Sequence, residues 1–280
     1  MKIKSLLLIG IGLIWLASCG NNRDAESAPS SDSGVFWIGQ DWSRQFVTQE
    51  YFNQQPSSIQ KLILHTAKID TRKGHGTGIY LGRGLMLTNS HVVRGRECRN
   101  LTIQIWNQSE SVSCRKILWS DRDVDAAIIE IDDQSLYHLE GYRLNNRRNL
   151  PRFTERVATA GFGTTLNPNL SMTIDSSSEC TVVSNNEMRF MPPPGTSPGL
   201  AYNVWAIPLT CDTSPGDSGA AVIDRDSGEL VGLIFGGRLR KNHQINIGSI
   251  NYQDAMIWDQ LSYAIPIREI MKRFMVDRRF

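Results

Sequence analysis

The chain has 280 residues, of which 40% are hydrophobic and 21% are charged, and its formal net charge is +2. This length and apolar fraction allow one large or two modest hydrophobic cores. The nearly balanced charge, with basic residues in short scattered clusters, argues against a nucleic-acid partner.

The first residues predict an export signal that is not part of the fold. Two lysines precede an apolar run over residues 6–16, which is too short for a typical membrane span. The run ends in the sequence LASC, which resembles the bacterial lipoprotein signal, so Cys19 would receive lipid. An ordinary secretory signal cut near Ala17 is the alternative. We expect a signal peptide over residues 1–18 and a protein anchored in the bacterial cell envelope, at the outer membrane if there is one.

Residues 19–34 contain only small and polar side chains besides Cys19, and such a segment cannot bury enough surface to fold. They predict a flexible tether between the lipid and the folded part. Aromatic residues return between residues 35 and 60, and we expect this stretch to pack onto a folded domain over residues 35–280.

The folded part consists of many short apolar segments separated by turns, which predicts an all-β fold. A polar connector over residues 138–149 divides it into two halves. We predict two antiparallel β-barrels, at about 58–145 and 155–266, followed by a helix over residues 267–278 with Pro266 at its start. The predicted strands lie at 62–65, 76–81, 84–87, 101–105, 111–117, 126–131, 157–160, 180–183, 205–209, 220–223, 230–237 and 263–265.

Four cysteines remain besides Cys19, and an even number in an exported protein suggests two disulfides. Three connectivities are possible. Cys98 and Cys114 lie on opposite arms of a predicted hairpin, at about the same level, so a bond between them is natural. We therefore favour Cys98–Cys114 together with Cys180–Cys211.

The sequence Gly216-Asp217-Ser218-Gly219 predicts a tight turn that presents one serine hydroxyl. Glycines let a substrate carbonyl approach the backbone N–H groups of the same turn. The same residue types also form ordinary loop turns, so the chemistry depends on finding a base and an acid elsewhere.

His91 and Asp125 are the candidates for the base and the acid. His91 follows an apolar strand and two small polar residues, although a histidine in apolar surroundings is often a core residue. Asp125 precedes a buried strand, although an acid there can simply cap a turn. A serine becomes nucleophilic when an imidazole takes its proton and a carboxylate orients that imidazole. His91, Asp125 and Ser218 fit these roles, and the N–H groups of Gly216 and Ser218 fit an oxyanion hole.

With these motifs in order, the chain resembles trypsin/chymotrypsin-like serine proteases, and more narrowly the bacterial exported members related to glutamyl endopeptidases and HtrA-type proteases. The resemblance covers about residues 36–275. It selects Asp125 over Asp123, because the family's acid has a small residue two places later. The matching segments are Thr88-Asn89-Ser90-His91-Val92-Val93, Asp125-Ala126-Ala127-Ile128-Ile129, Ala160-Gly161-Phe162-Gly163, Gly216-Asp217-Ser218-Gly219 and the opening Ile38-Gly39-Gln40-Asp41.

The resemblance also implies where specificity is read. The residue six places before the nucleophile lies at the base of the family's primary pocket, and here it is Asp212. An aspartate there implies cleavage after arginine or lysine, with Gly236 and Gly237 forming one open wall. The glutamate-reading histidine of glutamyl endopeptidases is replaced by Ile234. The alternative is that Asp212 caps a turn and faces away from the pocket.

We thus expect a monomeric serine endopeptidase that acts on polypeptide substrates through an acyl-enzyme and uses neither a cofactor nor a metal. The chain leaves no room after its last helix for the peptide-binding domain of HtrA-type proteases. The alternative is a lipid-anchored pseudoprotease, a binding module that uses the same cleft. A serine-reactive phosphonate distinguishes the two, because only an activated serine is labelled.

Overall fold

The computed structural model describes eleven stretches of the chain: residues 35–38, 43–108, 110–132, 140–144, 151–164, 167, 169–184, 188–190, 204–237, 243–246 and 261–277. The predicted signal peptide with Cys19, the predicted tether and most of the predicted connector lie outside the described residues.

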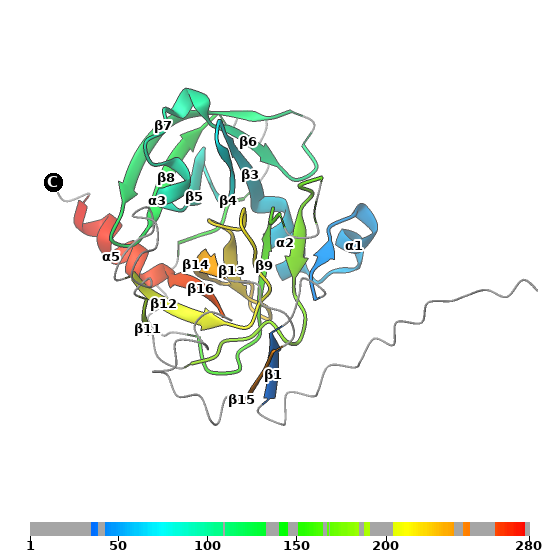
Figure 1. Ribbon diagram of the computed structural model, residues 1–280. Helices are drawn as coiled ribbons and strands as arrows, with labels where there is room; N and C mark the ends of the chain where they lie inside the picture. The colour runs from blue at the N-terminus through cyan, green and yellow to red at the C-terminus, as the bar shows by residue number, and fades with distance from the viewer. Residues whose placement is uncertain are drawn as a thin grey trace, which may run out of the picture.

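The first half is a closed antiparallel barrel with the strand order β3-β4-β5-β8-β7-β6, at the top of Figure 1. Alternation directs its side chains, since Ile103 and Ile105 point into the core while Thr102 and Gln104 are exposed. The strands are β3 (Thr66–Thr71), β4 (Gly74–Gly82), β5 (Leu85–Thr88), β6 (Thr102–Ile105), β7 (Val112–Asp121) and β8 (Ala126–Ile131).

The second half is an eight-stranded sheet with the order β11-β12-β16-β14-β13-β9-β10-β2. It confirms the all-β, two-part architecture that the sequence predicts. A separate pair, β1 (Val35–Ile38) with β15 (His243–Asn246), lies at the bottom of Figure 1. The strands of the large sheet are β2 (Gln45–Phe46), β9 (Val157–Gly161), β10 (Thr173–Asp175), β11 (Met188–Phe190), β12 (Val204–Leu209), β13 (Ala221–Asp224), β14 (Leu230–Gly237) and β16 (Ser262–Pro266).

Two strand predictions are wrong. Residues 62–65 belong to a helix, α2 (Ser57–His65), because the buried residues Ile59, Leu62 and Ile63 recur at helical spacing. Residues 180–183 form only isolated bridges, with Thr181 facing Arg156 and Val182 facing Leu209. Both segments are short and largely apolar, and in so short a segment periodicity does not distinguish a strand from a helix or an irregular segment.

A helix lies near each end of the described part of the chain. Part of the aromatic stretch packs on the domain: α1 (Gln49–Gln54) places Tyr51 and Phe52 against the main hydrophobic cluster, whereas Phe46 is 51% exposed. At the other end, α5 (Ile267–Asp277) follows β16 directly, so Pro266 ends the strand instead of starting the helix. Its apolar residues repeat at helical spacing, and Ile270 is fully buried.

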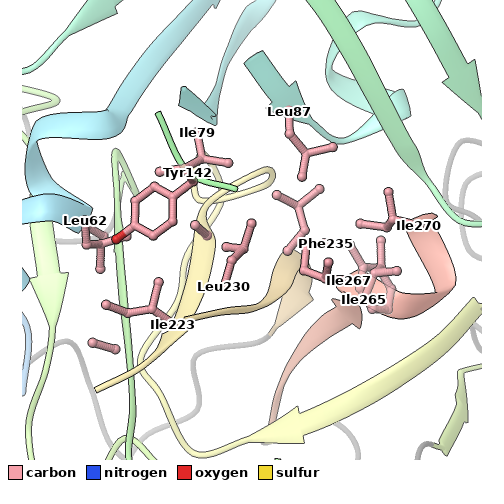
Figure 2. Close-up of a cluster of buried hydrophobic side chains, with 14 of the residues drawn as sticks. Leu62, Ile79, Leu87, Tyr142, Ile223, Leu230, Phe235, Ile265, Ile267 and Ile270 are labelled. Carbon is pink, nitrogen blue, oxygen red and sulfur yellow. The ribbon is translucent and has the colours of Figure 1, made fainter. Parts of the chain in front are cut away.

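The largest hydrophobic cluster lies between the two halves and joins them. Figure 2 shows Ile79 and Leu87 of the barrel facing Leu230 and Phe235 of the sheet, with Tyr142 from the segment between the halves beside them. All five side chains are at most 3% exposed. A shared, close-packed core of this kind fixes the two halves relative to each other, and therefore any site built at their junction.

Two disulfides are present, and they join the pairs favoured from the sequence. Cys98, in the short 3-10 helix η2 (Cys98–Asn100), bonds to Cys114 on β7 with a Cα–Cα distance of 5.2 Å. Cys180 bonds to Cys211 with a Cα–Cα distance of 4.1 Å. Cys98 thus lies before strand β6, and the prediction that it belongs to a hairpin arm is wrong.

No helix within the described ranges combines the length and the apolar character needed to cross a bilayer.

Candidate active site

His91 and Asp125 meet at the edge of the barrel through two contacts. The ring Nδ1 of His91 lies 2.7 Å from one carboxylate oxygen of Asp125, and the backbone N–H of His91 donates to the other at 2.9 Å. Asp125 is buried, while the His91 side chain is 23% exposed. The carboxylate therefore fixes both the position of the imidazole and its tautomer, with hydrogen on Nδ1, and leaves Nε2 to face outward.

Local backbone geometry places both residues. His91 lies in the one-turn helix α3 (Ser90–Val93) that follows β5, whereas the sequence suggests a position at the end of the strand itself. Asp125 has φ +43°, in the left-handed region that aspartate tolerates better than most residues. The amide of Asn89 donates to the Asp125 carbonyl at 2.9 Å and holds this conformation.

Ser218 is carried to the same edge of the barrel from the second half. Its carbonyl accepts the backbone N–H of Thr77 on β4 at 2.8 Å. A Cβ built on Gly76 would lie 2.7 Å from Val92, the neighbour of His91, and 3.2 Å from the Ser218 carbonyl. Gly76 thus lets the helix that carries His91 and the turn that carries Ser218 approach each other.

The turn around Ser218 is held by contacts that only glycine permits. Gly216 has φ +105° and Gly219 has φ +92°. A side chain on Gly219 would meet the Thr77 carbonyl at 2.0 Å. The Thr77 hydroxyl donates to the Gly216 carbonyl at 2.8 Å, and the ring Nε2 of His75 lies 2.6 Å from the Phe162 carbonyl beside Gly216. The barrel strand β4 therefore fixes the conformation of this turn.

The glycines of the Ala160–Gly163 motif make room for Asp217. A Cβ on Gly161 or on Gly163 would lie 2.4 or 2.5 Å from a carboxylate oxygen of Asp217. The carboxylate accepts the backbone N–H of Ser214 at 2.8 Å and pairs with the guanidinium of Arg44. This buried ion pair stands directly before the nucleophile position.

Asp212 lies in the same loop and is 5% exposed. Its carboxylate accepts the hydroxyl of Ser43, and its backbone N–H donates to the carboxylate of Asp175 at 2.8 Å. The hydroxyl of Ser262 donates to the neighbouring Cys211 carbonyl at 2.6 Å. Asp212 is therefore held by the N-terminal segment, by β10 and, through its neighbour, by β16.

The other two specificity candidates lie on β14. Gly236 pairs with Tyr263 and Gly237 with Ser262, next to the loop of Asp212. A Cβ on Gly236 would have no neighbour within 4 Å. Ile234 is buried in the sheet's interior cluster, so its side chain offers no polar group to a ligand.

Sequence reasoning missed Ser43, Arg44, His75 and Thr77. Each acts through a contact with a residue at least 85 positions away, such as His75 with Phe162 or Arg44 with Asp217. Isolated serine, arginine, histidine and threonine residues carry no spacing signal. Strand β2 cannot be predicted from the sequence either, because two residues show no periodicity.

The arrangement supports acyl transfer. An imidazole oriented by a buried carboxylate can take a proton from a hydroxyl, and a rigid glycine turn can direct N–H groups at a developing oxyanion. Within the described part of the chain, no group of three or more His, Cys, Asp or Glu residues is placed to hold a metal ion. The fold and the site together define a serine hydrolase of the double-barrel type.

Comparison with known proteins agrees with this class. The family model for the trypsin-like peptidase domain matches residues 76–233, which is more than half of the chain. The chain therefore belongs to the trypsin-like peptidase family, and it is a serine peptidase. A search of curated proteins found no match.

Solved structures of the same fold are distant in sequence. The Rv3671c protease in its inactive form is 16% identical, with a TM-score of 0.57, over 81% of this chain and 95% of that chain. Its active form from M. tuberculosis is also 16% identical, with a TM-score of 0.53, over 79% and 83%. The MamO protease domain from Magnetospirillum magneticum is 9% identical, with a TM-score of 0.54, over 77% and 98%. At such low identity these likenesses bear on the fold alone.

Proposed function

We propose that this peptidase is an endopeptidase that cleaves polypeptides through an acyl-enzyme on Ser218. The observation that carries the proposal is the double contact between Asp125 and His91 at the junction that also holds the Ser218 turn. His91 takes the proton of the Ser218 hydroxyl as that oxygen attacks the scissile carbonyl, and then returns the proton to the leaving amine. Water completes the cycle by the same route.

The backbone N–H groups of Gly216 and Ser218 stabilise the oxyanion of each tetrahedral intermediate. Support comes from the restraint on the turn, because the Gly216 carbonyl accepts the hydroxyl of Thr77 and the Ser218 carbonyl accepts the Thr77 N–H. Donors that are already oriented cost no reorganisation when charge develops, which is why such groups contribute strongly to rate.

A fluorescent phosphonate tests the catalytic proposal. Wild-type protein is expected to be labelled once, with the label on Ser218 by peptide mapping, and Ser218→Ala is expected to take up none. Ser227→Ala is the control, because it removes an exposed hydroxyl from the turn after β13 and should leave labelling intact. A folded wild-type protein that takes up no label would contradict the proposal and favour a binding module that uses the same cleft.

We further propose that cleavage occurs after arginine or lysine, with Asp212 reading the cation. The buried carboxylate of Asp212 already accepts the hydroxyl of Ser43, and a substrate guanidinium would add a charge-assisted hydrogen bond to it. A Cβ built on Gly236, on the strand beside this loop, would meet nothing within 4 Å, and this supports a place for a substrate side chain there. Residue 234 on the same strand is an isoleucine, so it cannot bind an acidic substrate side chain as the histidine of glutamyl endopeptidases would.

Carboxylates outnumber cations among the described contacts of the Asp212 loop, with Asp175 and Asp217 against Arg44, and this supports the same preference. Asp175, only 1% exposed, lies next to Asp212 and accepts its backbone N–H. Burial, and then the negative charge of Asp175, raise the pKa of Glu179 above its ordinary value. Carboxylates gathered in a region of low dielectric constant favour a cation over a neutral or acidic side chain.

Peptides that differ only in the residue before the scissile bond test the specificity. Arginine and lysine substrates should exceed leucine and glutamate substrates in kcat/KM by orders of magnitude. Asp212→Ser should lose this preference while Ser218 is still labelled by the phosphonate. Equal cleavage of all four peptides would contradict the assignment of Asp212 and leave the catalytic proposal intact.

Finally, we propose that lipid on Cys19 anchors the protein in the cell envelope, with residues 19–34 as the tether. The motif at residues 16–19 supports this. Several acyl chains anchor firmly, whereas one chain binds only marginally. The wild-type protein should therefore stay with membranes in high salt and incorporate labelled fatty acid, and Cys19→Ser should do neither. Membrane retention of Cys19→Ser would contradict the proposal.

A further inference from the structure

The N-terminal segment reaches into the second half and contacts the loop of Ser218. Its short strand β2 pairs with β10, with Phe46 opposite Thr173 and Gln45 opposite Ile174. The segment precedes the region matched by the family model, which begins at residue 76. Arg44, directly before this strand, has a side chain that is only 4% exposed.

The guanidinium of Arg44 forms a two-point ion pair with Asp217. One terminal nitrogen contacts one carboxylate oxygen, and the other nitrogen donates to the second oxygen at 3.0 Å. The Asp217 side chain is 2% exposed. Planar guanidinium and carboxylate groups match in this geometry, and removal of either partner leaves a buried charge uncompensated.

The same guanidinium also donates hydrogen bonds to two residues other than Asp217. It donates to the backbone carbonyl of Asp212 at 3.3 Å and to the hydroxyl of Thr173 at 2.5 Å. A single side chain thus ties both ends of the 212–217 loop to β10. A lysine could match the charge but not this set of directions, because its ammonium is a point charge.

Asp217 passes this restraint on to the nucleophile turn. Its carboxylate accepts the Ser214 N–H at 2.8 Å, its own N–H donates to the Ser214 carbonyl at 3.0 Å, and its carbonyl accepts the Ala220 N–H at 2.8 Å. These bonds close the turn on both sides of Gly216 and Ser218. If the carboxylate moved, the turn would lose these bonds, and the N–H groups of Gly216 and Ser218 would no longer be held in the direction of the oxyanion.

We propose that Arg44 is a positioning residue for catalysis, whose guanidinium holds Asp217 and thereby keeps Gly216 and Ser218 in the reactive conformation. The proposal rests on the catalytic role of Ser218 set out above. The role is indirect, since Arg44 acts through Asp217 on the donors and on the nucleophile.

Arg44→Met tests the proposal, because methionine keeps an apolar stem and removes the charge. We expect kcat to fall by about 10²-fold or more, as after loss of an oxyanion donor, with KM changed less than about threefold. Phosphonate labelling of Ser218 should slow in parallel, and Arg44→Lys should recover part of the loss. Arg156→Ala is the matched control, since it removes an exposed ion pair with Asp226 and should leave kcat unchanged.

A double variant, Arg44→Met with Asp217→Asn, covers the case in which the single variant does not fold. It leaves no uncompensated buried charge, so it should fold, yet its kcat should stay low because the loop is no longer held. A folded Arg44→Met or double variant with kcat within about threefold of wild type would overturn the proposal. That outcome would leave Arg44 with a role in charge balance alone.

Hydrogen exchange supplies a readout that does not depend on activity. The amides of Asp217 and Ala220 should exchange faster in the double variant, while amides between β3 and β4 should keep their wild-type protection. Unchanged protection of these loop amides would also overturn the proposal. A wild-type protein that neither hydrolyses peptides nor takes up phosphonate would instead contradict the proposed function, and the exchange data would still decide whether Arg44 orders the loop.

Discussion

Asp125 holds His91 with both of its carboxylate oxygens, one on the imidazole ring at 2.7 Å and one on the backbone N–H at 2.9 Å. Aspartate and asparagine tolerate the left-handed conformation of residue 125 about equally. Asp125→Asn should therefore fold and keep the backbone contact, while the ring loses the acceptor that fixes its tautomer. We expect kcat to fall by about 10⁴-fold with little change in the thermal midpoint.

Asp123→Asn is the control for this prediction. The carboxylate of Asp123 is 72% exposed and lies 3.2 Å from Arg273 of α5, away from His91. An exposed pair of this kind contributes little to stability, so the variant should retain nearly full activity. If Asp123→Asn were as inactive as Asp125→Asn, the acid would be assigned to the wrong residue.

Ser218→Ala and His91→Ala should each abolish nearly all peptide hydrolysis without unfolding the protein. Because the two groups act as one unit, the double variant should be scarcely slower than either single variant. Rates measured with a sensitive ester substrate would show this directly. Multiplied losses in the double variant would mean that Ser218 and His91 do not share a reaction step.

Much of this site follows from the sequence because each motif combines local structure with chemistry. The strand before Ser90, the buried strand after Asp125 and the glycines around Ser218 all use residue types that suit their backbone geometry. The disulfide pairs could be inferred as well, since few connectivities exist. In these cases a short stretch of chain contains nearly all the information that places the residue.

The supporting contacts could not be predicted in this way. Arg44 meets Asp217 across 173 positions, and the hydroxyl of Ser43 meets Asp212 across 169. Both depend on a two-residue strand at a sheet edge, where neither propensity nor periodicity operates. The helix over residues 57–65 is hard to predict for a different reason, because the short apolar run at its end, residues 62–65, suits a strand as well as a helix.

The Cys180–Cys211 disulfide joins the loop of Asp212 to the segment beside Arg156. Replacement of both cysteines by alanine should lower the free energy of unfolding by about 2–4 kcal/mol, measured by urea denaturation. Loss of the bond next to Asp212 should also raise KM for arginine substrates. Replacement of Cys98 and Cys114 should lower stability by a similar amount with no effect on KM. Equal effects on KM would show that the first bond has no special relation to the specificity loop.

Gly163→Ala should inactivate the protein by crowding the Asp217 carboxylate. The added Cβ would lie 2.0 Å from the hydroxyl oxygen of Ser214 and 2.5 Å from a carboxylate oxygen of Asp217. The hydroxyl can rotate away, whereas Arg44 and the Ser214 N–H hold the carboxylate in place. Phosphonate labelling of Ser218 should slow by at least about tenfold, of the order of losing part of an oxyanion contact. Gly236→Ala is the control, since its Cβ meets nothing within 4 Å and labelling should persist. Normal labelling of Gly163→Ala would show that the turn accommodates a shifted carboxylate.

His65 should make the stability of the fold depend on pH. It is 4% exposed, and its two ring nitrogens each lie 2.7 Å from a carbonyl, those of Lys61 and Glu140. A neutral imidazole can donate to only one of them. Burial nevertheless lowers the pKa of His65 from its ordinary 6.5, although both carbonyls act in the opposite direction. Desolvation of the charged ring therefore outweighs the gain of a second hydrogen bond.

The sign of the pH effect follows from this lowered pKa. Near pH 6.5 the unfolded chain binds the proton more tightly than the folded one, so the contribution of His65 is complete above that pH and is lost as the pH falls toward the folded pKa. Among the described residues, those with titratable side chains beside the ring include Lys61, Tyr80, Tyr142 and Glu140. Burial raises the pKa of Tyr142 above its ordinary value of 10, which keeps its charge unchanged through this window.

Urea denaturation of the wild type and of His65→Gln between pH 7.5 and 5 would measure the effect. A glutamine amide can donate both hydrogens without becoming charged, so the variant should lose less stability than the wild type as the pH falls through about 6.5. Since Glu140 and Tyr142 lie between the two halves, the wild-type loss should appear as global unfolding, seen equally by fluorescence and by circular dichroism. Parallel pH profiles for the two proteins would show that the two carbonyls compensate the buried imidazolium fully.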